Sequence, residues 1–98
     1  MKVLILDPAE KELKEAVAYY NFIDLRLGRK FIESFEKTID LIQKIPTGWE
    51  KISNKTRRIN FKEFPFLVLY VIDKDTIIIT FVCHGHRKSD YYKKHFHW

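Results

Sequence analysis

The sequence contains few of the residues that cross-link a chain or interrupt it. It has one cysteine, three glycines and three prolines among 98 residues. A single cysteine, Cys83, excludes an internal disulfide framework and suits a reducing cytoplasm. No apolar run approaches the roughly 20 residues that cross a bilayer, and the run from Val3 to Leu6 is too short for a signal peptide. We therefore expect a single cytoplasmic domain over residues 1–98, without membrane contact.

Metal-binding motifs are also missing. The chain has four histidines besides Cys83, but neither a CxxC nor an HExxH spacing. Its 46% hydrophobic and 15% aromatic content is typical of a globular domain with one core. We expect no metal and no cofactor.

Basic charge is concentrated in the second half of the chain. Residues 1–50 hold eight Lys/Arg and nine Asp/Glu, a net charge of −1, whereas residues 51–98 hold ten and four, a net charge of +6. The segment from Lys51 to Lys62 contains no acid and five bases: Lys51, Lys55, Arg57, Arg58 and Lys62. This asymmetry predicts a polyanionic partner, either a nucleic acid or an acidic protein segment. Ordinary solubility charge is the alternative.

The first half predicts a short strand followed by a helical hairpin. Asp7 and Pro8 are typical of an N-cap and a first helical position. Apolar residues at helical spacing then predict a helix that ends at Gly28 and a second that ends at Pro46. The second helix presents one apolar face: Phe31, Phe35, Ile39, Ile42 and Ile45.

Beyond Trp49 the apolar period changes to that of strands. Residues 57–61 alternate, so Ile59 should face inward, while Arg58, Asn60 and Lys62 should share the outward face. Residues 64–72 and 76–83 are dense in β-formers and are joined by a short hairpin link. The predicted fold is α+β, in the order β-α-α-β-β-β, with the helical hairpin packed on a mostly antiparallel twisted sheet.

Several short pieces occur in an order and spacing that resemble a known superfamily. They are Pro8-Ala9-Glu10, Leu27-Gly28 with Phe31, Ile45-Pro46, Arg58-Ile59, Phe64-Pro65-Phe66, Val68-Leu69-Tyr70, and Val82-Cys83-His84 with Arg87. Together they resemble the RelE/ParE superfamily of toxins from bacterial type II toxin–antitoxin pairs, over nearly the whole chain. The resemblance implies a growth-arresting toxin that a cognate antitoxin neutralises through an acidic, amphipathic segment.

The superfamily has two kinds of activity, and the resemblance leaves both open. RelE-like members cleave mRNA in the ribosomal A site without a metal, whereas ParE-like members lack the full catalytic set and are linked to inhibition of DNA gyrase. The Phe-Pro-Phe and His-x-x-Arg pieces place this chain closer to the ParE-like branch, which is the preferred interpretation. Two departures keep the RelE-like alternative: Ser89 stands where many ParE-like relatives have proline, and the chain ends in His95-Phe96-His97-Trp98.

Metal-free RNA cleavage needs a base, an acid and a cation for the phosphate. Arg58 and Arg87 are candidate cations, because guanidinium stays charged and binds phosphate in a bidentate manner. The candidate acids or bases are His84 and Tyr91, with His86, Tyr92, His95 and His97 as further possibilities. The candidates for binding RNA or a partner are Lys51, Lys55, Arg57, Lys62, His86 and His97. The alternatives are that both arginines only bind the antitoxin or pair with Glu63 or Asp90, and that His84 is structural.

Overall fold

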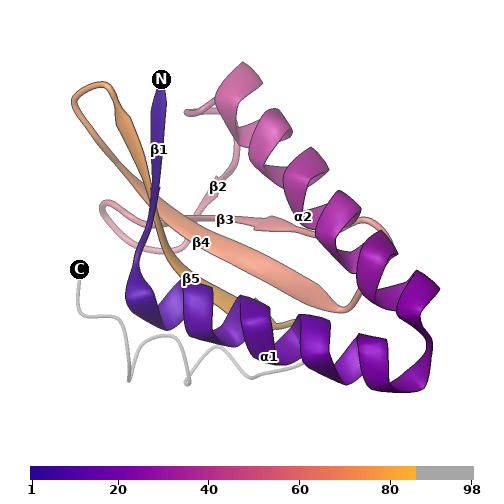
Figure 1. The fold of residues 1–98 in the computed structure, drawn as a ribbon. Helices are drawn as coiled ribbons and strands as arrows, with labels where there is room; N and C mark the ends of the chain where they lie inside the picture. Colours follow the sequence, from indigo (N-terminus) through magenta and orange to yellow (C-terminus); the bar gives the residue numbers. More distant parts are fainter. Residues whose placement is uncertain (86–98) are drawn as a thin grey trace.

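The computed structural model of this chain describes residues 1–85. These residues form one five-stranded sheet and two helices (Figure 1). The elements are β1 (Lys2–Ile5), α1 (Asp7–Ile23), α2 (Leu25–Lys44), β2 (Glu50–Lys51), β3 (Arg57–Asn60), β4 (Phe66–Asp73) and β5 (Thr76–His84). Both helices pack on the same side of the sheet, which we call the helix face, and the opposite side is the far face. The expected α+β architecture is confirmed, with the two-residue strand β2 added.

The strand order is β1-β5-β4-β3-β2. β1 runs parallel to β5, and every other neighbouring pair is antiparallel. β1 lies at one edge of the sheet. The helical hairpin carries the chain to the opposite edge, and the antiparallel strands β3–β5 then lead back until β5 lies parallel to β1. The sheet is therefore mixed, and β1 and β2 are its two edges.

The start of α1 is fixed by the end of strand pairing. We expected Asp7 to be the N-cap, and this was wrong by one residue: Leu6 is the N-cap, and no side chain caps the helix. The Leu6 N–H still donates to Ile79 O in the sheet, and the Leu6 carbonyl already accepts from Glu10 N–H. Asp7 and Glu10 lie in the first turn, where negative charge interacts favourably with the helix dipole.

The break between the helices lies at Asp24 and not at Gly28, which corrects our expectation. Asp24 has an extended backbone (φ −166°, ψ 128°) and serves both as the last residue bonded to α1 and as the N-cap of α2. Its carboxylate accepts from Arg26 N–H at 2.8 Å and pairs with the Arg26 guanidinium at 2.8 Å. An aspartate that satisfies the first free N–H groups of the next helix ends the preceding one effectively.

Gly28 instead has a packing role inside α2. It is buried, and a Cβ built at this position would collide with the side chain of Asn21 in α1. A side chain at this position would therefore require the Asn21 side chain to move.

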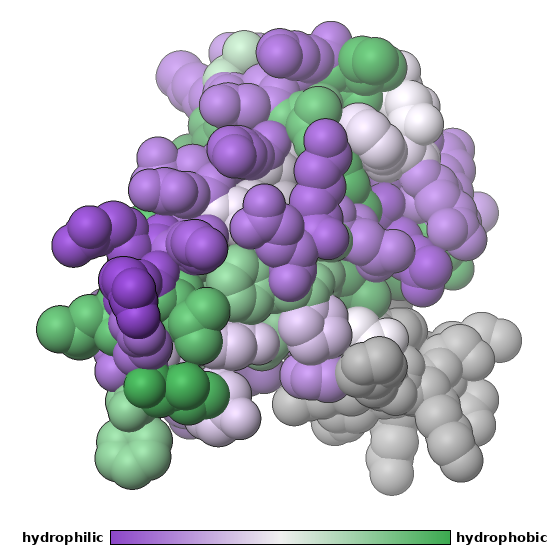
Figure 2. All heavy atoms as spheres, turned by 90° about the vertical axis from the view of Figure 1, so that its right-hand side faces the viewer, coloured by the Kyte–Doolittle hydropathy of each residue, from purple (hydrophilic) through white to green (hydrophobic). Residues whose placement is uncertain are grey.

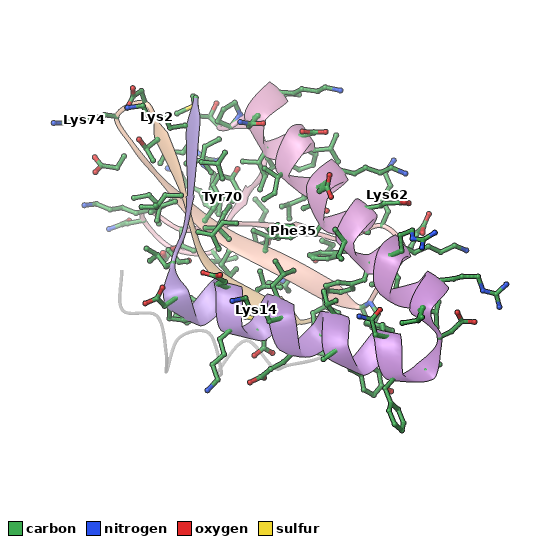
Figure 3. The ribbon with its side chains drawn as sticks, in the orientation of Figure 1. Lys2, Lys14, Phe35, Lys62, Tyr70 and Lys74 are labelled. Atoms are coloured by element: carbon green, nitrogen blue, oxygen red, sulfur yellow. The ribbon has the colours of Figure 1, made fainter. Side chains whose placement is uncertain are left out.

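The helix face carries an aromatic core. Phe31 is fully buried and contacts four other rings, with centroid distances of 5.1–5.3 Å; these are Tyr20, Phe61, Phe64 and Phe66. Phe35 and Tyr70 occupy the space between the helices and the sheet (Figure 3). The Tyr70 hydroxyl donates to Pro46 O at 2.6 Å, so the loop after α2 is tied to the centre of β4.

A bulge divides β5 into two parts. Leu69 pairs with Phe81 but Tyr70 pairs with Ile79, so Thr80 has no partner residue in β4. The Thr80 hydroxyl donates to Leu69 O at 3.2 Å. One extra residue inverts the alternation of side chains between the two faces, so Ile77 and Ile79 face the helices before the bulge, and Val82 does so after it.

Candidate functional site

The candidate residues of β3 lie on opposite faces of the sheet. Arg58 is opposite Leu69 in register, and Leu69 belongs to the small far-face cluster with Leu67 and Cys83. Arg58 therefore lies on the far face, as expected from the alternation. Its side chain is 35% exposed, and its Nε lies 3.3 Å from Glu50 Oε2. A half-exposed guanidinium is available to an anionic group that displaces Glu50.

Arg57 lies toward the helix face and holds the loop that precedes β2. Its Nη1 donates to Thr47 O at 2.9 Å and to Trp49 O at 2.7 Å. Trp49 Nε1 in turn donates to Leu41 O at 3.3 Å. These bonds give Arg57 a structural task in the described residues, beside the partner-binding role that the sequence suggests.

His84 is placed away from Arg58. It is opposite Phe66 in register, and the two rings meet at a centroid distance of 5.2 Å and an angle of 63°. Because Phe66 is part of the helix-face core, His84 lies on the helix face, whereas Arg58 lies on the far face. The structure therefore places these two candidates on opposite faces of the sheet.

Tyr70 is also unsuited to proton transfer near neutral pH. Burial raises its pKa to about 12, although the nearby Arg57 cation acts in the opposite direction. Its hydroxyl is already a donor to Pro46 O. Within residues 1–85, neither this tyrosine nor His84 supplies an acid or base beside Arg58.

Lys62 does not share the face of Arg58, which corrects the expectation from alternation. β3 ends at Asn60, and the connector to β4 turns back toward α2 (Figure 3). Lys62 lines a groove of about 540 Å³ beside α2, together with Lys30, Glu33, Lys37 and Asp40. This groove carries both signs of charge and is separate from the other candidates.

Lys51 and Lys55 are brought together at a second groove, of about 590 Å³. We call it the basic groove; the residues that matter below are Leu6, Lys51, Asn54, Lys55, Val71 and Ile78. Both lysines are exposed, whereas the three apolar residues are half-buried. The apolar part of this groove was not predicted, because the dense apolar runs at 64–72 and 76–83 do not indicate which side of these strands stays partly uncovered.

Exposed apolar side chains also gather at the helix junction, where Phe22 is 91% exposed and Leu25 is 72% exposed. In Figure 2, apolar surface lies toward the hairpin end, below a largely hydrophilic α2.

The remaining candidates lie outside the described residues: His86, Arg87, Tyr91, Tyr92, His95 and His97. Within residues 1–85, no cluster of three or more His, Cys, Asp or Glu side chains could hold a metal ion. Neither helix in this range is long and apolar enough to cross a membrane.

Two solved structures share this architecture. One is described as the chromosomal ParDE TA system from P. aeruginosa, with a TM-score of 0.74, 14% sequence identity, and coverage of 86% of this chain and 95% of that chain. The other is the isolated E. coli RelE toxin, with a TM-score of 0.62, 13% identity, and coverage of 95% and 93%. At such identities the likeness establishes the fold alone.

The sequence identifies the branch. Residues 3–91 match the family model of the ParE toxin of type II toxin–antitoxin systems, parDE. The chain therefore belongs to the ParE toxin family. None of the curated proteins matches it significantly.

Proposed function

We propose that this chain arrests growth by a ParE-like action on DNA gyrase and that a cognate antitoxin neutralises it. The family match over residues 3–91 supports the toxin role. The observation that carries the non-nucleolytic mechanism is the separation of His84 and Arg58 onto opposite faces of the sheet. Cleavage would need an acid or base within hydrogen-bond reach of the reacting oxygens. In residues 1–85 neither His84 nor Tyr70 lies beside Arg58, and the carboxylate that does, Glu50, is paired with the Arg58 guanidinium.

The basic second half supports the antitoxin partner. The far face presents Arg58, and Lys51 and Lys55 line the basic groove, while the acids of the chain lie mostly in the helical half. An acidic segment that folds onto such a surface would gain charge pairing and apolar burial at the same time. Antitoxin binding to this surface would also block access to it by any other target.

A second candidate function is ribosome-dependent cleavage of mRNA, and one observation favours it. Arg58 projects from the far face with only an exposed ion pair to Glu50, so it could bind a phosphate. A nucleolytic mechanism would then have to take its acid and base from beyond residue 85, where Arg87, Tyr91 and His97 stand in the sequence.

One experiment separates the two functions. The chain is induced briefly in cells, and primer extension is carried out across an abundant translated mRNA. Growth arrest with intact transcripts, together with loss of supercoiling by purified gyrase in the presence of the chain, is the expected result. New cleavage ends in phase with codons, absent in Arg87→Ala, would replace the gyrase proposal with the nucleolytic one. Absence of growth arrest would contradict both.

A further inference from the structure

The basic groove combines an apolar floor with a basic rim. Ile78 in β5 is in register with Val71 in β4 on one side and with Leu4 in β1 on the other. Their neighbours along each strand, including Val3, Tyr70 and Ile77, belong to the helix-face core, so this row lies on the far face. Leu4 is 51% exposed, and Val71 and Ile78 are half-buried. Contiguous aliphatic surface beside a groove is typical of a site that another molecule covers.

The rim supplies positive charge without a partner for it. Lys51 and Lys55 stand in and just after β2, and neither takes part in an ion pair among residues 1–85. The charged lining residues are Lys51, Lys55, Arg57 and Asp73, which is three bases and one acid, a net charge of +2. The Arg57 guanidinium is already bonded to Thr47 O and Trp49 O, so the two lysines are the groups free to bind an anion.

The chemistry of the lining selects among possible occupants. Single-stranded nucleic acid binds largely by stacking on aromatic side chains, and none of the residues between 1 and 85 that line this groove is aromatic. A second copy placed symmetrically would set the same basic rims against each other. The chain's own residues 86–98 carry Arg87, Lys88, Lys93 and Lys94 against the single acid Asp90, so the rim would repel them. An acidic protein segment with aliphatic side chains fits both parts of the groove.

We propose that the basic groove binds an acidic, amphipathic segment of the cognate antitoxin, with aliphatic side chains on Val71 and Ile78 and carboxylates on Lys51 and Lys55. The inference rests on the proposed function, since it names the surface through which neutralisation occurs. It assigns the lysines to antitoxin binding and leaves the toxic action to other parts of the chain.

The binding test uses the full chain and a fluorescent peptide that alternates leucine and glutamate, with a leucine–lysine peptide as its negative control. Fluorescence anisotropy should show binding of the acidic peptide only. The double variant K51E/K55E should weaken binding roughly tenfold or more, because each rim contact changes from attraction to repulsion. The matched control is K11E/K37E, which makes the same change of charge at exposed positions of α1 and α2 and should bind like the wild type.

A second variant tests the floor without a change of charge. Val71→Thr keeps a β-branched residue in the strand and should weaken binding roughly threefold, because it removes apolar contact. Equal binding by all variants, or no binding of the acidic peptide, would overturn the proposal. Lysine-dependent binding of single-stranded oligouridine in place of the peptide would overturn it in favour of RNA. Self-association abolished by K51E/K55E would overturn it in favour of a second copy.

Measurements in cells separate failure of this inference from failure of the proposed function. If expression of the wild-type chain does not arrest growth, the proposed function is contradicted, whatever the groove binds. We expect that the K51E/K55E variant still arrests growth and that co-expressed cognate antitoxin no longer neutralises it. K51E/K55E that is toxic and fully neutralised would overturn the groove assignment while the toxin function stands.

Discussion

The two faces of the sheet differ in what their side chains do. The helix face is filled by fully buried rings and aliphatic chains contributed by every long element, with Phe31 at the centre. The far face has a much smaller buried cluster, Leu67, Leu69 and Cys83, bordered by Arg58 and by the basic groove. Stability is therefore concentrated on one face and available charge on the other. Substitutions in the helix-face core should therefore lower stability, whereas substitutions of far-face charges should leave stability nearly unchanged and weaken toxicity.

The largest expected effect is the loss of stability caused by Phe31→Ala in the helix-face core. Removing a buried ring that contacts four others should lower the free energy of unfolding by roughly 3–5 kcal/mol, through lost transfer energy and a residual cavity. Urea denaturation followed by circular dichroism measures it. The control is Phe22→Ala, since Phe22 is 91% exposed and should change stability little. Similar losses in both variants would contradict the assignment of the core.

The next largest effect on stability is expected for the Tyr70 hydroxyl, which links β4 to the loop after α2. Tyr70→Phe removes the donor to Pro46 O and should cost about 1 kcal/mol. Because the folded pKa is raised to about 12 from about 10 in the unfolded chain, the wild type should lose stability as the pH rises above about 10 and up to 12. Denaturation at increasing pH should show this loss in the wild type and a smaller one in Tyr70→Phe. A parallel decline in both proteins would contradict it.

The sequence was sufficient to predict most of the fold, because the period of the apolar residues is strong. The change from helical to strand spacing near Trp49 separated the hairpin from the meander. The boundary at Gly28 was wrong because two local signals competed. An aspartate that caps the next helix ended α1 four residues earlier, and the glycine served the close contact with Asn21.

The site was less predictable, because it depends on which face each side chain occupies. Strict alternation from Ile77 and Ile79 would have placed His84 on the far face, the same face as Arg58. The bulge at Thr80 moves His84 to the helix face, and nothing in the residue types of β5 indicates that position. The opposite faces of Arg57 and Arg58, by contrast, follow directly from their adjacency in β3.

A smaller effect is expected at the helix junction, which belongs to neither face of the sheet. Hydrogen bonds from the Arg26 side chain and backbone hold the pKa of Asp24 below its ordinary value. A lowered pKa means that the stabilisation is present above the unfolded value of about 4 and is lost as the pH falls through the folded one. Melting temperatures measured across this acidic range should decline less steeply in Asp24→Asn, which keeps a capping side chain but loses the charge. Identical slopes would contradict a contribution from this pair.

The smallest effect on stability, and the clearest contrast between the faces, is expected for Arg58→Ala. Its ion pair with Glu50 is exposed, and exposed pairs typically contribute within about 0–1 kcal/mol, so the melting temperature should barely change. Growth arrest should nevertheless weaken, because the substitution removes the central cation of the far face. The control is Arg29→Ala, an exposed arginine of α2, which should match the wild type in both measurements. A folded Arg58→Ala protein with full toxicity would mean that the far face does not take part in the toxic action, and its charge would then serve only the antitoxin.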